Sequence, residues 1–292
     1  MQSIISYKER GRYGKPNYRG NCSGFIIKDL IEHFYPKTKP KKLIEIFSGG
    51  GTGKDVANEL NIKNSLHLDL NNGWDALIDE IPSGSDFVFS HPPYWNIINY
   101  EKQRNKYEAN DLSNNMSYEE FIKKLDIVNE KIFHSLIHGG RHITLLGDVR
   151  KNGKYYSIIK DMKWYGDLES HIIKAQHNCV SDNKIYNNNS FIAIKHEHIL
   201  VFKKNKIWIF NTKITNTIVD NIMNATNITW RDLIQATIEY LNNKASIEEI
   251  YNILKKSKKA ENNNYVREKI RQVLNINHNF EKVGEFWTLS IE

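Results

Sequence analysis

The sequence predicts an α/β sandwich built on a mostly parallel sheet, followed by a small helical tail that ends in a hairpin. Two observations predict the sandwich. Short apolar strands alternate with amphipathic helices through the first two hundred residues, and a glycine-rich turn joins one buried strand to the helix that follows it. A third observation, the change to an all-helical pattern from about residue 216, predicts a separate domain there.

The composition is that of an ordinary globular protein. Hydrophobic residues make up 40% and charged residues 26% of the 292 residues, with 41 Lys and Arg against 34 Asp and Glu. The resulting net charge of +7 is compatible with a polyanionic partner. No apolar run is long enough to span a membrane, residues 1–12 lack a signal peptide's apolar stretch, and the two cysteines are too few for a disulfide framework. We therefore expect a cytoplasmic protein with no membrane partner.

The first elements are predicted in a clear order. Residues 1–22 form a basic arm, and the spacing of Ile27, Leu30, Ile31 and Phe34 then predicts a helix that ends before Pro36. Strands are predicted at 43–47, 66–70 and 87–89, and a helix at 54–60. Residues 101–116 are polar and rich in turn formers, which predicts a mobile loop.

The next part begins with a helix start signal. Ser117-x-x-Glu120 predicts a capping box that opens a long helix, which Gly139-Gly140 is expected to end. A strand is predicted at 142–146, and residues 192–194 and 199–202 are predicted to pair as two strands. The first domain, including the arm, is expected to cover residues 1–210.

The tail carries the parts of a winged helix-turn-helix. Thr229-x-x-Asp232 and Ser246-x-x-Glu249 predict two helix starts, a third helix is expected at about 264–274, and residues after Gly284 predict a hairpin. Residues 216–292 are therefore predicted to form a winged-helix-like DNA-binding domain.

The glycine-rich turn, residues 48–53, predicts a binding site for an anionic or nucleotide-like ligand. Free backbone N–H groups and the positive end of the next helix meet there. A P-loop is excluded, because Ser48 stands where it needs glycine and Asp55 stands where it needs serine or threonine. An adenosine-type cofactor remains, with Asp69 accepting hydrogen bonds from the ribose, and so does a purely structural turn.

The segment His91-Pro92-Pro93-Tyr94 follows the strand at 87–89. Two prolines stiffen the chain, and a carbonyl freed at this corner can accept from a substrate amino group. Neutral His91 offers a second acceptor, and the Tyr94 ring offers a face for stacking on a base. A rigid turn plugged by an aromatic side chain is the alternative interpretation.

These motifs resemble those of the amino-group DNA methyltransferases. The run Glu45-x-Phe47-Ser48-Gly49-Gly50-Gly51-Thr52 is similar to their cofactor motif, and His91-Pro92-Pro93-Tyr94 is similar to their catalytic (D/N/S)-P-P-(Y/F/W) motif. Residues 196–204 resemble their late H-E-x-I-L-V-F strand, so the resemblance covers about residues 19–204.

The resemblance implies a seven-stranded Rossmann-like class I methyltransferase sandwich and S-adenosyl-L-methionine as cofactor. It implies methyl transfer to the exocyclic amine of a flipped base, N6 of adenine slightly preferred over N4 of cytosine. Double-stranded DNA is the expected partner, and an associated restriction endonuclease is a second candidate partner. An RNA or protein methyltransferase and a catalytically inactive DNA-binding regulator remain alternatives.

The resemblance also implies site residues. The catalytic residues would be His91, Pro92, Pro93 and Tyr94. The cofactor-binding residues would be Asn21, Ser23, Glu45, Phe47, Ser48, Gly49, Gly51, Thr52 and Asp69. For DNA contacts, the basic and polar residue types predict Lys102, Arg104, Lys106, Gln176, Asn178, Arg267, Lys269 and Arg271.

The sequence supports three further expectations. His91 stands where the family has Asp, Asn or Ser, and an unperturbed imidazole predicts activity that falls below roughly pH 6.5. The 40 or so residues between the two motifs hold one predicted strand, where the family often has two. His196 and His198 lack a third ligand at suitable spacing, so no metal site is predicted.

Overall fold

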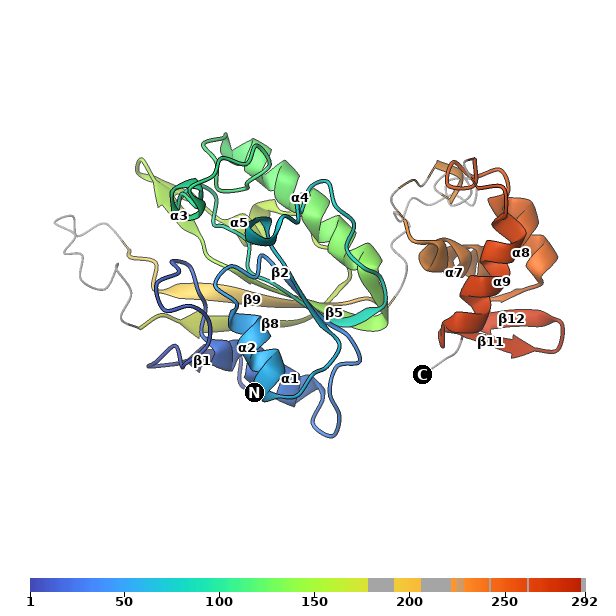
Figure 1. Cartoon of the computed structure of the whole chain (residues 1–292), viewed down its shortest axis with the longest axis horizontal. Coiled ribbons are helices and arrows are strands. Elements are labelled where there is room, and N and C mark those ends of the chain that lie inside the picture. Colours follow the sequence, from blue (N-terminus) through green and yellow to red (C-terminus); the bar gives the residue numbers. More distant parts are fainter. Residues whose placement is uncertain are drawn as a thin grey trace. The chain divides into compact units, whose positions relative to one another are not determined.

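A computed structural model of the chain (Figure 1) describes residues 1–177, 192–205, 222–224, 226, 228–241, 243–261 and 263–289. The chain divides into two compact units, Met1–Lys204 and Asn205–Glu292. Asn178 and Cys179, and the predicted domain start at 216, lie outside the described residues. No helix in the described ranges is long and apolar enough to cross a membrane.

The first unit alternates strands and helices in the predicted order. Its longer helices are α1 (Gly24–Phe34), α2 (Thr52–Glu59) and α4 (Tyr118–Ser135), with short η1 (Leu70–Asn72), α3 (Glu101–Arg104) and α5 (Ile158–Asp161). Its strands are β1 (Ile4–Ser6), β2 (Leu43–Ile46), β3 (Ser65–Leu68), β4 (Ser85–Ser90), β5 (Leu136–Leu146), β6 (Val149–Lys151), β7 (Lys154–Tyr156), β8 (Asp167–Ala175) and β9 (His196–Lys203).

Seven of these strands form one mixed sheet in the order β1-β8-β9-β5-β4-β2-β3. The neighbours β2, β3, β4 and β5 run parallel, β1 runs parallel to β8, and β9 runs antiparallel to both β5 and β8. Only β3 lies in sequence between β2 and β4, as the short spacing predicts. The seventh strand comes from the N-terminal arm, because β1 pairs with the sheet edge at β8, which the sequence pattern did not indicate.

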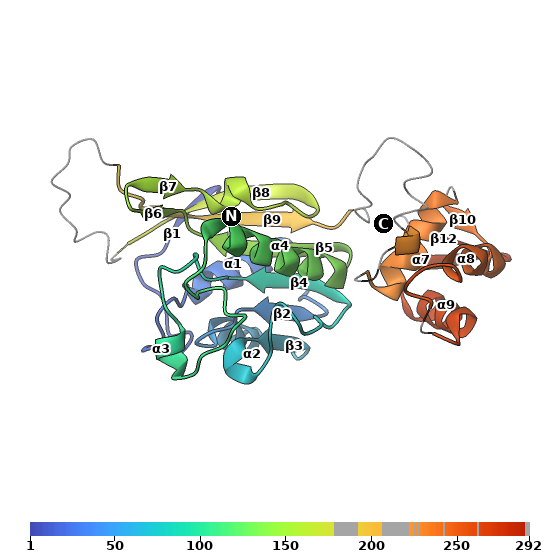
Figure 2. The same cartoon turned by 90° about the horizontal axis from the view of Figure 1, so that it is seen from above.

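The helices cover both faces of this sheet (Figure 2). Alternate residues of β4 separate the two layers, since side chains along a strand point to opposite faces. Phe87 and Phe89 pack with α1 and α2, whereas Val88 packs with α4. The helix α1 ends at Phe34, shortly before Pro36, which disfavours helical backbone in the residue that precedes it.

Two predictions about the second half of the unit are wrong. The helix α4 ends at Ser135, and Gly139-Gly140 lies inside β5, which continues directly from the helix. Residues 192–194 form no strand; β9 instead pairs with β8, which the charged sequence concealed. Ser117 does cap α4, accepting from the backbone N–H of Glu120.

The second unit contains α7 (Trp230–Tyr240), α8 (Ile247–Leu254) and α9 (Val266–Ile276), and a three-stranded sheet of β10 (Lys244–Ala245), β11 (Phe280–Val283) and β12 (Phe286–Leu289). Thr229 and Ser246 cap the first two helices as predicted, and Ser246 and Glu249 form a complete capping box. Leu233, Ile234 and Ile250 lie fully buried in its own core. The winged-helix function of this unit stays a prediction.

Candidate active site

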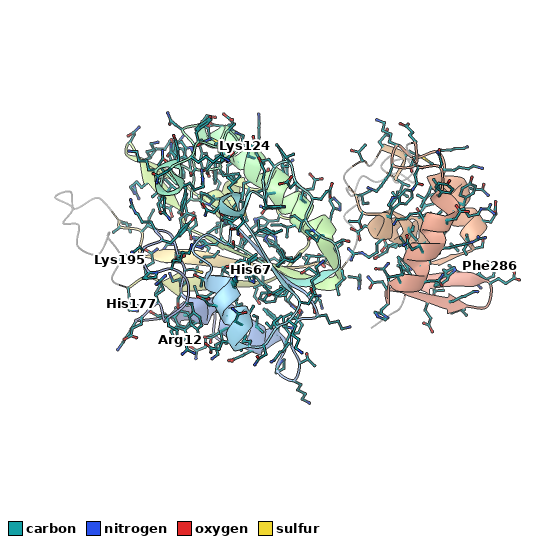
Figure 3. All side chains as sticks on the ribbon, viewed as in Figure 1. Arg12, His67, Lys124, His177, Lys195 and Phe286 are labelled. Atoms are coloured by element: carbon teal, nitrogen blue, oxygen red, sulfur yellow. The ribbon has the colours of Figure 1, made fainter. Side chains whose placement is uncertain are left out.

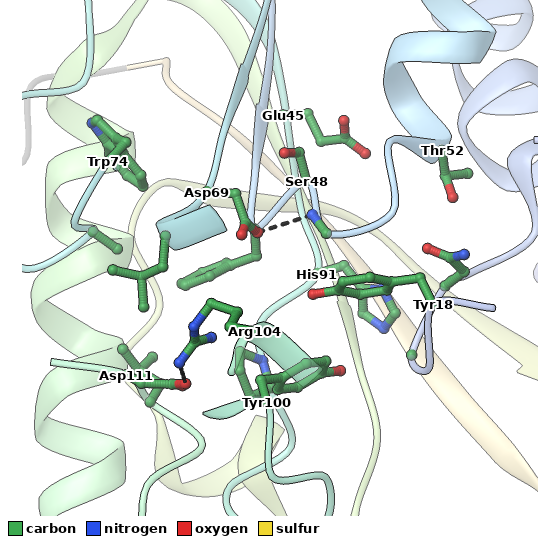
Figure 4. Close-up of a pocket in the computed structure, with 18 of the residues that line it drawn as sticks. Tyr18, Glu45, Ser48, Thr52, Asp69, Trp74, His91, Tyr100, Arg104 and Asp111 are labelled. Carbon is green, nitrogen blue, oxygen red and sulfur yellow. Dashed lines mark hydrogen bonds and ion pairs between the residues drawn. The ribbon is translucent and has the colours of Figure 1, made fainter. Parts of the chain in front are cut away.

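A pocket opens at the carboxyl ends of β2, β3 and β4 (Figure 4). This is the edge where ligands bind in parallel α/β sheets. The glycine-rich turn after β2 and the Pro-Pro corner after β4 both line it, because these two strands are direct neighbours. The lining residues are Tyr18, Gly20, Asn21, Cys22, Glu45, Phe47, Ser48, Gly49, Thr52, Asp69, Leu70, Trp74, Ala76, His91, Pro93, Tyr100, Arg104, Asn110, Asp111 and Leu112.

The glycine-rich turn is held in an unusual conformation. Phe47 has a φ of 62°, which is strained for a side chain of its size. Gly51, at the start of α2, has a φ of 89° with open space where a Cβ would stand. The buried Glu45 carboxylate accepts from Gly53 N at 2.9 Å and lies 2.7 Å from His67 Nδ1, so it fastens the turn to β3.

Asp69 occupies the middle of the pocket. It is 8% exposed, and its carboxylate accepts from Gly49 N at 2.9 Å and from Asn71 N at 2.8 Å. Burial raises the pKa of Asp69 above its usual value. Each carboxylate oxygen has a second lone pair, so Asp69 can accept further hydrogen bonds from a ligand in the pocket.

Thr52 marks one end of the pocket. Its Oγ1 is buried and has no hydrogen-bond partner among the described residues, although it stands at the first turn of α2. A buried hydroxyl without a partner is costly, and the N-terminus of a helix favours an anion. Trp74 lies at the other end of the pocket, with Ser48 and Asp69 between the two (Figure 4).

The outer wall of the pocket comes from two segments distant in sequence. Tyr18, from the N-terminal arm, stacks on Tyr100 with ring centroids 5.9 Å apart, and its ring also lies against Gly49. Arg104 forms a buried ion pair with Asp111. Residues 101–116 thus include a packed wall rather than only a polar loop. The Arg104 side chain is held by this ion pair and lines the pocket, and its predicted contact with DNA stays a prediction.

His91 belongs to a partly buried polar network. Its Nε2 lies 3.0 Å from the Tyr94 hydroxyl, which donates to Glu197 Oε1 at 2.8 Å. Burial tends to raise the pKa of Glu197, but the Lys174 ammonium beside it, with His91 and two hydrogen bonds, outweighs this and lowers the pKa. Glu197 is therefore an anion, and burial keeps Tyr94 protonated by raising its pKa.

The hydrogen bonds of this network determine which ring nitrogen of His91 carries the hydrogen. The single Tyr94 proton points to the Glu197 anion, so the hydroxyl can only accept from His91. His91 Nε2 must then carry the ring hydrogen, and Nδ1 carries the lone pair. No described residue hydrogen-bonds Nδ1, and His91 lines the pocket. The pocket therefore contains a hydrogen-bond acceptor at this corner.

The pKa of His91 corrects the expected pH dependence. Burial lowers this pKa from 6.5 to about 4, because a charged imidazole loses its hydration there. The resemblance implies methyl transfer, and we expect its single-turnover rate to stay level from pH 7 to about pH 5. The rate should fall as the pH approaches 4, because a protonated His91 can no longer accept a hydrogen bond. A half-maximal rate near pH 6.5 in rapid-quench measurements, with the fold intact by circular dichroism, would contradict this assignment.

Several predicted site residues lie elsewhere. Pro92 is buried between His91 and Pro93, which both line the pocket, and Ser23 donates to Arg10 O instead of lining it. Lys102 and Lys106 are exposed, Gln176 follows β8, and Cys22 is buried in the pocket wall. In the second unit, Lys269 and Arg271 lie on α9, whereas Arg267 pairs with Glu248 and stacks over Tyr251.

Sequence reasoning missed much of the pocket wall. Tyr18, Trp74, Tyr100 and Asp111 all line it. The only local signal was the density of aromatic residues near glycine in the N-terminal arm, which does not reveal what those rings cover.

No family model and no curated protein matches the sequence. Among solved structures, the chain is similar to TrmN from Thermus thermophilus, with 13% identity and a TM-score of 0.39 over 64% of this chain and 50% of that one. It is also similar to a provisionally assigned DNA modification methylase from the same organism, with 20% identity and a TM-score of 0.31 over 61% and 60% of the two chains.

A third similar structure is a provisionally assigned class I S-adenosylmethionine-dependent methyltransferase from Listeria monocytogenes, with 16% identity and a TM-score of 0.35 over 65% and 62% of the two chains. This chain spans less than two thirds of the length of each of these proteins. The fold is assigned from the strand order of this chain: the described residues of its first unit form a seven-stranded, mixed α/β sheet typical of Rossmann-like class I methyltransferases.

Proposed function

We propose that the chain is an S-adenosylmethionine-dependent DNA methyltransferase that modifies the exocyclic amine of a flipped base, N6 of adenine before N4 of cytosine. One observation carries the proposal: the glycine-rich turn and the His91 corner line the same pocket. A cofactor on the turn and a base at the corner would then share one cavity.

The pocket residues suit S-adenosylmethionine along its length. Thr52 Oγ1 and the N-terminus of α2 would hold the carboxylate, and Asp69 would accept from the ribose hydroxyls. Trp74, at the far end of the pocket, would enclose the adenine ring together with Leu70 and Ala76, which also line the pocket. When bound, the cofactor supplies an electrophilic methyl group on a sulfonium.

The Pro-Pro corner would hold and orient the base amine. His91 Nδ1 and the Pro92 carbonyl would each accept one amine hydrogen, which favours the pyramidal, nucleophilic form of the nitrogen. The Tyr94 ring is fixed by Glu197 and packs against Gly147, where a Cβ would come within 2.5 Å of the ring. A fixed ring loses little entropy when it stacks on a base.

The substrate class is inferred from charge and from the second unit. The net charge of +7 favours a nucleic acid, and the exposed Arg271 and the half-exposed Lys269 on α9 would contact phosphates. Truncation near residue 210 is expected to weaken binding to duplex DNA at least tenfold while leaving cofactor affinity unchanged. Fluorescence anisotropy with labelled duplex measures the DNA affinity, and calorimetry measures the cofactor affinity. An unchanged DNA affinity would show that the second unit takes no part in DNA recognition.

The proposal is tested by methyl transfer from labelled S-adenosylmethionine to unmodified DNA, followed by nucleoside analysis. N6-methyladenine or N4-methylcytosine in the DNA supports it and identifies the target. Transfer to transfer RNA or protein, with none to DNA, would assign the same pocket to a different substrate. Cofactor binding without transfer to any of the three would favour the inactive DNA-binding regulator.

A further inference from the structure

A second cluster of polar side chains lies beside the sheet, away from the pocket. It contains Asp148, between β5 and β6, and His196 and His198 on β9. One ligand atom from each lies within 4.8 Å of the other two. We propose that these three residues bind a divalent metal ion of the zinc class.

The topology explains why the sequence did not reveal this set. His196 and His198 point to the same face because they alternate along β9. Asp148 is about fifty residues earlier, but β5 and β9 pair antiparallel with Leu146 opposite His198, which brings the carboxylate to the two imidazoles. The expectation that no third ligand is available is therefore wrong.

Two of the proposed ligands contact each other, and two residues outside the set, His171 and Tyr155, contact them as a second layer would. His198 Nε2 lies 3.2 Å from Asp148 Oδ2, and its other nitrogen, Nδ1, lies 3.0 Å from His171 Nε2. The Tyr155 hydroxyl donates to Asp148 Oδ2 at 2.5 Å. Metal-binding imidazoles and carboxylates are commonly oriented by such outer hydrogen bonds.

Asp148 Oδ1 and the His196 ring are the two groups of the cluster that could bind an ion without losing a hydrogen bond to a described residue. The Asp148 side chain is 5% exposed, and its Oδ1 forms no hydrogen bond within the described residues. The His196 ring lies edge-on to His198, with centroids 4.8 Å apart, and no described residue hydrogen-bonds it. A carboxylate oxygen and an imidazole that no described residue hydrogen-bonds are groups that Zn²⁺ commonly binds in proteins.

The proposed site is distinct from the His91 network. Glu197 lies between the two histidines on β9 and therefore points to the opposite face, where it contacts Tyr94 and Lys174. His196 is the first residue of β9 and directly follows Lys195, which is labelled in Figure 3. Two imidazoles and one carboxylate leave room for water or a further ligand on the ion.

Calorimetric titration of the full-length, tag-free, chelator-treated protein with Zn²⁺ tests the proposal. We expect one ion per chain, with affinity at least tenfold weaker in His196→Ala and in Asp148→Asn. His33→Ala, which removes an exposed histidine on α1, is the matched control and should bind Zn²⁺ as the unaltered protein does. His171→Ala should weaken binding by a smaller factor, because His171 only orients His198.

A spectroscopic readout separates binding at this cluster from binding elsewhere. Titration with Co²⁺ should give visible absorption bands of a nitrogen- and oxygen-ligated ion, and His196→Ala should abolish them. Circular dichroism of each variant without metal verifies that it is folded. The absence of stoichiometric binding, or equal binding by folded His196→Ala and Asp148→Asn, would overturn the proposal.

Discussion

Replacing His91 by leucine is expected to lower the single-turnover rate of methyl transfer by a factor of about 10²–10⁴, the usual effect of removing a positioned proton acceptor or dipole. Leucine fills similar space but cannot accept a hydrogen bond. The Nδ1 lone pair, which the Tyr94–Glu197 network leaves facing no described residue, would be lost. Rapid-quench measurements at saturating cofactor and DNA give the rate directly.

His91→Asn is the matched control for this prediction. Its side-chain oxygen can accept from an amine, and asparagine is one of the residues that the resembled family has at this position. The variant is expected to keep a much larger part of the rate than His91→Leu. Cofactor affinity should change little in either variant. A His91→Leu protein that is folded and transfers methyl groups at the normal rate would exclude a direct role for the imidazole.

Replacing Asp69 by alanine is expected to weaken S-adenosylmethionine binding about 10- to 100-fold. A hydrogen bond to a charged group contributes about 1.5–3 kcal/mol, and 1.4 kcal/mol corresponds to about a tenfold change in affinity. Part of the effect would come from the turn, because Asp69 also holds Gly49 N and Asn71 N. Isothermal titration calorimetry measures the affinity, and thermal unfolding monitors the fold.

Asp69→Asn separates the two contributions. The amide oxygen can still accept from one backbone N–H, so the turn should keep more of its order, but the charge that favours the ribose hydroxyls is removed. We expect an affinity between those of the unaltered protein and Asp69→Ala. Wild-type affinity in a folded Asp69→Ala protein would show that this carboxylate does not contact the cofactor.

Local sequence signals determined the order of the elements and the two ends of the candidate site. The glycine-rich turn, the Pro-Pro corner and the caps at Ser117, Thr229 and Ser246 act through a few neighbouring residues, so they can be recognised without the fold. The single strand between the two motifs also followed from their spacing.

Only the tertiary structure decided what surrounds those motifs. The pairing of β1 with β8, the wall formed by Tyr18 and Tyr100, and the approach of Asp148 to His196 all join segments distant in sequence. The lowered pKa of His91 likewise depends on burial, which no spacing reveals. Hydrophobic periodicity and turn chemistry act over a few residues, whereas pocket walls, ligand sets and pKa values depend on which strands become neighbours.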